Sequence, residues 1–244
     1  MELKRQAAEH ALRYVRSGMI LGLGSGSTTT YFVQLLGERL KSGELGAIQG
    51  VPASRETAAL AERLDIPLTS LAEQPRLDLA VDGADEVDPQ LNLIKGLGRA
   101  LLREKIIVVH SAEFVVIVDE TKRVPRLGAR GPLPVEILPF EWPAHLRWLN
   151  AQGCRAELWR ERDDSPVVTD NGNYLARCWF ESKSDRGAEA KLSGIPDPYA
   201  LAQALANRPG ILEHGLFLDM ASRAVVATPE GIEVLERKSM AGEP

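Results

Sequence analysis

Glu104 stands out as a carboxylate on the apolar side of a predicted helix. The segment Leu97–Val109 has the spacing of an amphipathic helix, and Leu101 and Val108 lie on the side that carries Glu104. A carboxylate in apolar surroundings is costly unless it is paired or functional. Desolvation raises the pKa of such a group toward neutrality, where a general base works best. A structural ion pair is the alternative, because ion pairs also bury carboxylates.

A lysine stands just before this helix, in the run Lys95-Gly96-Leu97-Gly98. A lysine beside flexible backbone can stabilise an oxyanion that develops during a reaction, and the N–H groups of Gly96 and Gly98 can assist it. A surface lysine at a turn explains the same residues more simply, so this segment alone carries no conclusion.

An acidic loop, Asp82-Gly83-Ala84-Asp85-Glu86-Val87-Asp88, follows a buried strand. Ligands of open parallel sheets bind outside the carboxyl ends of strands, so this position favours a site. Four carboxylates in seven residues raise the possibility of a divalent cation, but the spacing does not match a calcium loop and no histidine lies nearby. Two of these carboxylates could instead hold sugar hydroxyls and move protons between oxygens. A solvated acidic turn is the alternative.

The loop Gly22–Thr28 combines alternating glycines with hydroxyl side chains. Glycine lets backbone N–H groups approach an anion closely, and the helix that follows adds its positive end. The loop lacks both the glycine spacing of a dinucleotide site and the lysine of a phosphate loop. Backbone amides with the hydroxyls of Ser25, Ser27 and Thr28 around Gly26 suit a small terminal phosphate. A tight turn with capping serines is an equally good explanation of the loop.

These segments alternate with elements of a doubly wound α/β sheet. The predicted strands are short and nearly all apolar, which is typical of a parallel sheet buried on both faces: 19–21, 47–51, 77–81 and 114–118. The predicted helices lie between or before them: 1–16, 29–40, 55–64 and 97–109. Lys122, in Asp119-Glu120-Thr121-Lys122, then comes to the same sheet edge as the acidic loop and could close on a phosphate.

A stretch rich in proline and glycine, 126–143, indicates a domain boundary. Beyond it the pattern predicts a small, ferredoxin-like α+β domain, with strands at 135–138, 155–160 and 174–180 and helices at 143–152 and 197–206. Three later pieces, 212–218, 224–227 and 232–235, are expected to return to the first sheet. The predicted domains are therefore residues 1–128 with 208–244, and residues 129–207.

The bulk properties exclude several classes of protein. The net charge is −5 and the basic residues are scattered, which argues against a nucleic-acid partner. No apolar run reaches the roughly 18 residues of a membrane span, and the N-terminus has no apolar signal core, so we expect a cytoplasmic protein. Cys154 and Cys178 lack metal-ligand spacing and are expected to be small apolar fillers.

Six segments in register, spread over nearly the whole chain, resemble the type A family of ribose-5-phosphate isomerases: GLGSGSTT, VDGADEVD, KGLGRALLREKI, VDETK, PLPVEILP and VVTDNGN. The resemblance implies a Rossmann-like domain with a second α+β domain, in homodimers or homotetramers. It also implies a cofactor-free and metal-free interconversion of ribose 5-phosphate and ribulose 5-phosphate through an enediolate, in the pentose phosphate pathway.

The resemblance assigns roles residue by residue. Glu104 matches the general base and Lys95 the lysine that stabilises the oxyanion. Asp82 and Asp85 match carboxylates that contact sugar oxygens and assist ring opening. The phosphate is assigned to hydroxyl and lysine side chains: Ser27, Thr28, Lys122 and Lys4. Four further residues are predicted to line the substrate: Ser25, Gly26, Gly96 and Gly98.

The sequence departs from the family pattern near the site. Leu97 and Arg99 stand where the family has small residues in a KGGGAA segment, so the entry to the helix of Glu104 is bulkier. The segment Trp159–Pro166 is longer and more charged than usual and is expected to form a surface hairpin.

Two other functions are compatible with this fold. A non-catalytic sugar-phosphate sensor should carry a helix-turn-helix before the fold, but only about 18 residues precede the first predicted strand, and a sensor has no need of Glu104 on an apolar stripe. A coenzyme-A transferase uses a glutamate as nucleophile and is usually longer. Fold analogy alone does not separate these functions.

Overall fold

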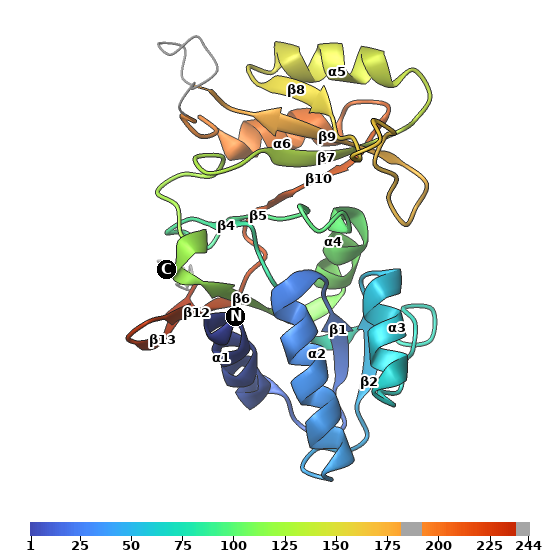
Figure 1. Cartoon of the computed structure of the whole chain (residues 1–244), viewed down its shortest axis with the longest axis vertical. Helices are drawn as coiled ribbons and strands as arrows, with labels where there is room; N and C mark the ends of the chain where they lie inside the picture. Colours follow the sequence, from blue (N-terminus) through green and yellow to red (C-terminus); the bar gives the residue numbers. More distant parts are fainter. Residues whose placement is uncertain (182–191, 238–244) are drawn as a thin grey trace, which may run out of the picture.

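A computed structural model describes residues 1–181 and 192–237 (Figure 1). Its larger domain is built on a six-stranded sheet in the order β13-β12-β6-β3-β1-β2. The strands are β1 (Ile20–Leu23), β2 (Gln49–Pro52), β3 (Leu77–Asp82), β6 (Ser111–Asp119), β12 (Arg223–Thr228) and β13 (Gly231–Glu236). All neighbouring pairs are parallel except β12 with β13, so the sequence-based prediction of a mostly parallel α/β sheet is confirmed.

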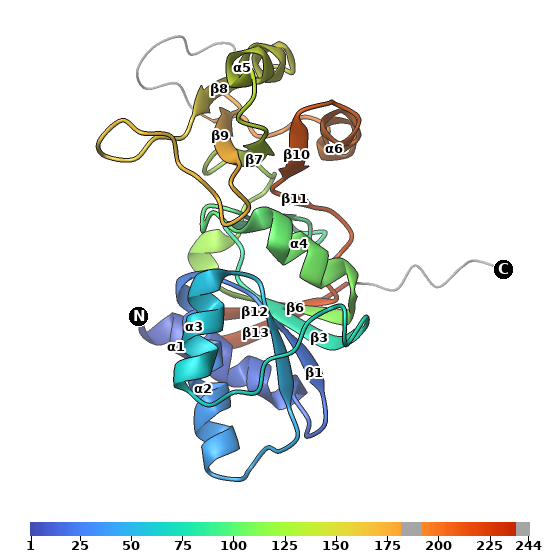
Figure 2. The same cartoon turned by 90° about the vertical axis from the view of Figure 1, so that its right-hand side faces the viewer.

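Helices cover both faces of this sheet (Figures 1 and 2). On one face lie α1 (Glu2–Ala11), α2 (Gly26–Lys41) and α3 (Arg55–Arg63), which pack on side chains such as Leu79 and Ile117. On the other face α4 (Leu101–Val109) packs Ile107 and Val108 on Ala80 and Val116. Side chains of one strand alternate between the two faces, so the all-apolar strands supply two cores at once.

Several predicted helix boundaries are wrong. The first helix ends at Ala11 and continues as the 3-10 helix η1 (Leu12–Tyr14), and α2 begins at Gly26, three residues before Thr29. Helix α4 begins at Leu101 rather than at Leu97. Gly96 has a φ of 110° and Arg99 a φ of 69°, which are left-handed conformations that a right-handed helix cannot contain.

The smaller domain has the βαββαβ order of a ferredoxin-like fold. Its elements are β7 (Leu133–Ile137), α5 (Trp142–Ala151), β8 (Arg155–Leu158), β9 (Tyr174–Trp179), α6 (Pro198–Ala206) and β10 (Ile211–His214). The sheet order is β10-β7-β9-β8 and every pair is antiparallel. The Asp197 carboxylate caps α6 by accepting hydrogen bonds from the N–H groups of Tyr199 and Ala200.

The segment 212–218 does not return to the first sheet as predicted. β10 pairs with β7 in the smaller domain, and β11 (Leu216–Phe217) joins β5 (Leu93–Ile94) and β4 (Glu86–Val87) in a three-stranded sheet. Only β12 and β13 rejoin the large sheet. We therefore propose that the chain re-enters the larger domain after His214 rather than at residue 208. Residues 182–191 and 238–244, which fall within the predicted domains, lie outside the described residues.

Helix α4 lies between the two domains (Figures 1 and 2). Its first residue, Leu101, packs with Val167 and Leu175 of the smaller domain, while Ile107 packs in the core of the larger one. The helix predicted to carry the base is therefore positioned by both domains.

Cys154 and Cys178 are free and buried in the apolar core of the smaller domain, as fillers would be.

Within residues 1–181 and 192–237, no helix is long and apolar enough to span a lipid bilayer.

Candidate active site

A cavity of about 250 Å³ opens at the carboxyl ends of the central strands. It is lined by segments that follow β1, β3 and β6 and by the start of α4. Eleven of the twelve predicted site residues line it: Lys4, Ser25, Gly26, Ser27, Thr28, Asp85, Lys95, Gly96, Gly98, Glu104 and Lys122. The segments that bear chemistry thus converge because parallel strands end at one edge of a sheet.

Asp82 is the predicted residue that does not line the cavity. Its Oδ1 accepts hydrogen bonds from the N–H groups of Ser25 (3.0 Å) and Gly83 (2.7 Å) and from the hydroxyl of Thr29 (3.0 Å). Its Oδ2 lies 2.8 Å from Nζ of Lys95. Both oxygens therefore have partners within the protein, and the contact of Asp82 with sugar oxygens stays a prediction.

Gly24 allows this arrangement, because the glycine loop passes directly over Asp82. A Cβ atom at Gly24 would lie 2.1 Å from Cγ of Asp82, far closer than two carbons can approach. The N–H of Gly24 also donates to the carbonyl of Val81 at 3.0 Å, which ties the loop to β3. The glycine is required here for close approach rather than for an unusual φ angle.

Gly24→Ala is expected to lower the free energy of unfolding by about 1–3 kcal/mol, as overpacking in a filled interior does. It should also reduce kcat more than tenfold, because Asp82 must shift away from Lys95. Chemical denaturation and steady-state kinetics measure the two effects. Gly46→Ala is the matched control, since a Cβ atom there would meet no heavy atom of the described residues within 4 Å. If Gly24→Ala and Gly46→Ala have the same free energy of unfolding and the same kcat, this role of Gly24 is contradicted.

Lys95 is buried at the centre of the site. Its Nζ donates to the carbonyl of Gly83 at 2.6 Å and lies 2.8 Å from Asp82 and 3.3 Å from Oε2 of Glu104. Burial alone would lower the pKa of Lys95, but the two carboxylates outweigh burial and raise the pKa above its ordinary value. Lys95 is therefore a permanently charged ammonium group that faces the cavity.

Glu104 is 3 % exposed and lies on the first turn of α4, with its carboxylate toward the cavity. Its Oε1 accepts a short hydrogen bond from the hydroxyl of Ser25. Its Oε2 is close to Lys95 but makes no hydrogen bond within the described part of the chain. Burial and the nearby Asp82 carboxylate raise the pKa of Glu104 to about 7, against the opposing effects of Lys95 and Ser25. Glu104 is thus a buried carboxylate in contact with a cation, and its role as the base stays a prediction.

The acidic loop does not gather its carboxylates around one point. Asp82 pairs with Lys95, and the other three accept backbone N–H hydrogen bonds from separate segments: Asp85 from Leu97, Glu86 from Gly128, Arg130 and Gly131, and Asp88 from Gln90 and Asn92. No cluster of three or more His, Cys, Asp or Glu that could hold a metal ion occurs within the described ranges. Hydrogen bonds from backbone N–H groups and the ion pair with Lys95 therefore hold the acidic loop in place.

Asp85 is the carboxylate of this loop that lines the cavity. Burial raises its pKa, against the opposing effects of the Leu97 N–H, Lys95 and Lys122. The Leu97 N–H donates to Oδ2 of Asp85 at 2.9 Å. Leu97, which departs from the family pattern, therefore fixes Asp85 through its backbone and is itself one of the residues that line the cavity.

The cavity is also lined by hydroxyls and lysines. Nζ of Lys4, from α1, donates to the hydroxyl of Ser27 at 2.8 Å, and Thr28 and Lys122 line the cavity as well. Ser25 precedes the first residue of α2, so the free N–H groups of that helix start lie next to these side chains. Positive charge, hydroxyls and a helix N-terminus together suit a dianionic phosphate group.

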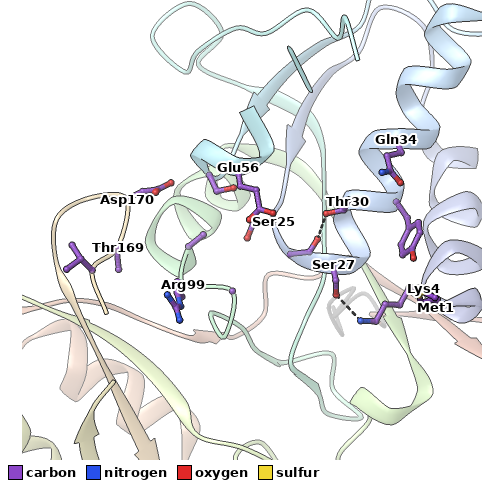
Figure 3. Close-up of a pocket in the computed structure, with 16 residues that line it drawn as sticks. Met1, Lys4, Ser25, Ser27, Thr30, Gln34, Glu56, Arg99, Thr169 and Asp170 are labelled. Atoms are coloured by element: carbon purple, nitrogen blue, oxygen red, sulfur yellow. Dashed lines mark hydrogen bonds between the residues drawn. The ribbon is translucent and has the colours of Figure 1, made fainter. Parts of the chain in front are cut away.

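A second, larger cavity of about 670 Å³ adjoins the first (Figure 3). The two share Lys4, Ser25, Gly26, Ser27 and Gly98 as lining residues. In Figure 3, Lys4 and Ser27 point toward one another on one side of the larger cavity, while Thr169 and Asp170 of the smaller domain lie on the other. Both domains therefore form the approach to Glu104.

Arg99, the second departure from the family pattern, joins the domains at this approach. Its guanidinium forms an ion pair with both carboxylate oxygens of Glu161 and lies 5.3 Å from the ring centroid of Trp159. Arg160 and Pro166 form an isolated antiparallel bridge, so 159–166 is the predicted hairpin. The bulk of Arg99 is thus turned toward the hairpin.

Some residues of the site were missed by the sequence prediction. The carbonyl of Gly83 holds Lys95, and the buried ring of Phe217 lies 5.5 Å below its Nζ. Gly83 belongs to the quoted acidic loop, so its proximity could have been foreseen. Phe217 gave no signal, because an apolar residue in a late strand looks like any other core residue.

Moving a proton between adjacent carbons of a phosphorylated sugar requires a group that can take and release a proton near neutral pH, with a cation close by to stabilise negative charge. The small cavity offers Glu104 beside the ammonium group of Lys95, together with hydroxyls and lysines that suit a phosphate. On a Rossmann-like sheet, this defines an aldose–ketose isomerase. The model of the family described as "Ribose 5-phosphate isomerase A (phosphoriboisomerase A)" matches residues 49–231. The chain belongs to that family, whose members are enzymes that interconvert ribose 5-phosphate and ribulose 5-phosphate.

Known proteins agree with this assignment over nearly the full length. The chain is 51% identical over 236 residues to ribose-5-phosphate isomerase A of Roseiflexus sp. (strain RS-1), covering 97% of this chain and 96% of the relative. The corresponding protein of Pyrococcus horikoshii is 45% identical, covering 97% and 98%. The solved structure of ribose 5-phosphate isomerase A from Methanocaldococcus jannaschii is 37% identical with a TM-score of 0.87, covering 96% and 98%.

Proposed function

We propose that the smaller cavity is where this chain interconverts D-ribose 5-phosphate and D-ribulose 5-phosphate, with Glu104 as the base. The observation that carries the proposal is the placement of Glu104, a buried carboxylate with a pKa of about 7 that lines the cavity beside the ammonium group of Lys95. The relatives that match over nearly the whole chain bear the name of the enzyme, so nothing supports the non-catalytic sensor.

Glu104 both removes the proton from C2 and delivers a proton to C1. Its Oε2, which accepts no hydrogen bond from the described residues, takes the proton from C2 of the open-chain aldose. The electron pair of the broken C–H bond moves into an enediolate that carries its negative charge on O1. The hydroxyl proton of O2 then moves to O1, and the same carboxyl returns its proton to C1, so that C2 becomes the carbonyl of the ketose. Ser25 holds Oε1, so the carboxylate keeps its direction during the transfer.

Lys95 stabilises the negative oxygen of the enediolate. Its ammonium is fixed by Asp82 and by the Gly83 carbonyl, so it is oriented before the reaction begins and need not reorganise. Gly96 and Gly98 line the same cavity, and we assign their N–H groups to assist Lys95. We assign Asp82 to holding Lys95 in place.

The phosphate anchors the substrate against Ser27, Thr28, Lys4 and Lys122. A ribose-5-phosphate isomerase that is 44% identical to this chain, with a TM-score of 0.88, was solved in complex with phospho-erythronic acid, so a relative binds a phosphorylated acid. Fixing the phosphate turns the proton transfer into a positioned, intramolecular step. Asp85, whose pKa is raised by burial, is placed to exchange a proton with the ring oxygen during ring opening.

We place the enzyme in the pentose phosphate pathway of the cytoplasm, acting on a small sugar phosphate without cofactor or metal and without a nucleic-acid or membrane partner. A homodimer or homotetramer is the assembly that fits its family. Sedimentation of the purified chain measures the assembly directly, and a monomer at working concentrations would contradict it.

The pH dependence follows from Glu104. The base must be unprotonated to accept the C2 proton, so kcat/KM is expected to fall as pH decreases through about 7, where the carboxylate takes up its proton. Ser25→Ala removes a hydrogen bond that lowers the pKa of Glu104. The pH at which kcat/KM is half its maximum should therefore be higher in this variant than in the wild type. A profile that stays flat between pH 6 and 8 would exclude Glu104 as the base.

The direct test is an assay of ribulose 5-phosphate formation by the purified protein, with and without a chelator. We expect turnover that the chelator leaves unchanged. Loss of activity with chelator would restore the metal interpretation of the acidic loop. Binding of ribose 5-phosphate without turnover would instead favour the sensor.

A further inference from the structure

Helix α4 presents neighbouring side chains to different partners. Glu104 faces the catalytic cavity, whereas Arg103 reaches the loop 169–173 of the smaller domain. The guanidinium of Arg103 donates to Oδ1 of Asn171 at 2.8 Å and to the carbonyl of Asp170 at 3.0 Å, and it pairs with the Asp170 carboxylate at 3.3 Å. The residue beside the proposed base is therefore held by a loop of the other domain.

That loop is organised by a buried carboxylate on β7. Glu136 has no exposed surface, and its Oε1 accepts three hydrogen bonds: from the hydroxyl of Thr169 at 2.9 Å, from Nδ2 of Asn171 at 3.1 Å and from Nδ2 of Asn173 at 2.8 Å. Its Oε2 is buried without a hydrogen-bond partner among the described residues. Burying a polar oxygen in this way costs free energy, so stability alone is a poor reason for a carboxyl group here.

Asn171 connects the two groups directly. Its amide nitrogen donates to Glu136 while its amide oxygen accepts from Arg103, so one side chain bridges β7 and α4. Asp170 adds a second attachment, because its Oδ2 accepts from the N–H of Arg55 at the start of α3 at 2.8 Å. Thr169 and Asp170 also line the larger cavity, opposite Lys4 (Figure 3). The loop thus spans both domains at the approach to the site.

We propose that Glu136 is a positioning residue for the isomerase reaction, acting through Asn171 and Arg103 to fix the first turn of α4 and hence the direction of the Glu104 carboxylate. Glu136 touches no substrate. The inference rests on the proposed role of Glu104. It gives the smaller domain a part in the chemistry, because a loop of that domain sets the geometry of a base carried by the larger one.

Two variants test this role, Glu136→Gln and Asn171→Ala. Glu136→Gln keeps the shape of the side chain and weakens its three charge-assisted hydrogen bonds. Asn171→Ala removes the side chain that connects Glu136 to Arg103, at a residue exposed to solvent. We expect kcat to fall about 10- to 100-fold with KM changed less than about twofold, because small displacements of a positioned group have effects of this size. The midpoint of the acid limb of kcat should rise as Glu104 loses its contacts with Ser25 and Lys95.

Hydrogen exchange of the peptide that covers residues 99–109 gives a readout independent of activity, and exchange there should be faster in both variants. Glu157→Gln is the matched control, since Glu157 lies on β8 of the same sheet and pairs with Arg155 and Arg177 rather than with the loop 169–173. The inference is overturned if the variants melt at a lower temperature yet keep the wild-type kcat, pH profile and exchange. If the wild type itself has no isomerase activity, the proposed function fails instead, while the exchange result still decides whether Glu136 orders α4.

Discussion

Glu104→Gln is expected to reduce kcat by about 10²–10⁴-fold, the range that a positioned general base contributes, with little change in KM. The amide has the shape of the carboxylate and can still accept the hydrogen bond from Ser25, but it cannot take a proton from C2 near neutral pH. The side chains assigned to the phosphate are untouched, so binding should persist. Steady-state kinetics measures the loss of turnover, and calorimetric titration with ribose 5-phosphate measures the affinity.

Solvent exchange separates a lost base from a disturbed site. Wild-type enzyme in deuterated water should introduce deuterium at C1 of the ketose as Glu104 exchanges its proton, and the glutamine variant should not. Glu113→Gln is a suitable control, because Glu113 forms an ion pair with Arg223 on the sheet and lies outside both cavities. If Glu104→Gln keeps more than a tenth of the wild-type turnover, another group removes the proton.

The site residues could be predicted because their positions follow from strand order. Residues that directly follow parallel strands meet at one edge, so Ser25 and Asp85 had to approach each other once the strands were recognised. The face of the sheet to which a side chain at the strand end points depends on the alternation of side chains along the strand. The sequence motif alone does not show which face this is. Asp82 shares the face of Ala80, on the side covered by α4, and it therefore points to Lys95 beneath the cavity.

Errors in the predicted elements have tertiary causes. Helix α4 was expected to begin at Leu97, since helical periodicity does not report the left-handed backbone of Arg99 that turns the chain. The fourth strand of the smaller domain was missed because 212–218 looked continuous. Gly215 interrupts it: a Cβ there would lie 2.1 Å from the carbonyl oxygen of Lys95. The glycine was visible in the sequence, but the reason for it was not.

Lys95→Met is expected to lower kcat by about 10²–10³-fold, the size of effect found when an oxyanion-stabilising donor is removed. It should also destabilise the protein by about 3–5 kcal/mol at pH 8, because Asp82 and Glu104 lose the cation between them and remain buried. Lys122→Met is the contrasting variant. Lys122 lines the cavity and is assigned to the phosphate, so its loss should raise KM more than it lowers kcat.

The loss of stability in Lys95→Met should depend on pH, and the sign follows from Glu104. Lys95 lowers the pKa of Glu104, so without the lysine that pKa rises still further above its value in the unfolded chain. A carboxyl with a raised folded-state pKa binds its proton more tightly in the native state, so its contribution is present at low pH and is lost as pH increases. The free energy of unfolding of the variant should therefore differ least from that of the wild type at pH 5 and most at pH 8. Denaturant unfolding at both pH values measures this, and equal losses would mean that Lys95 does not neutralise the buried carboxylates, leaving its charge without the role assigned to it.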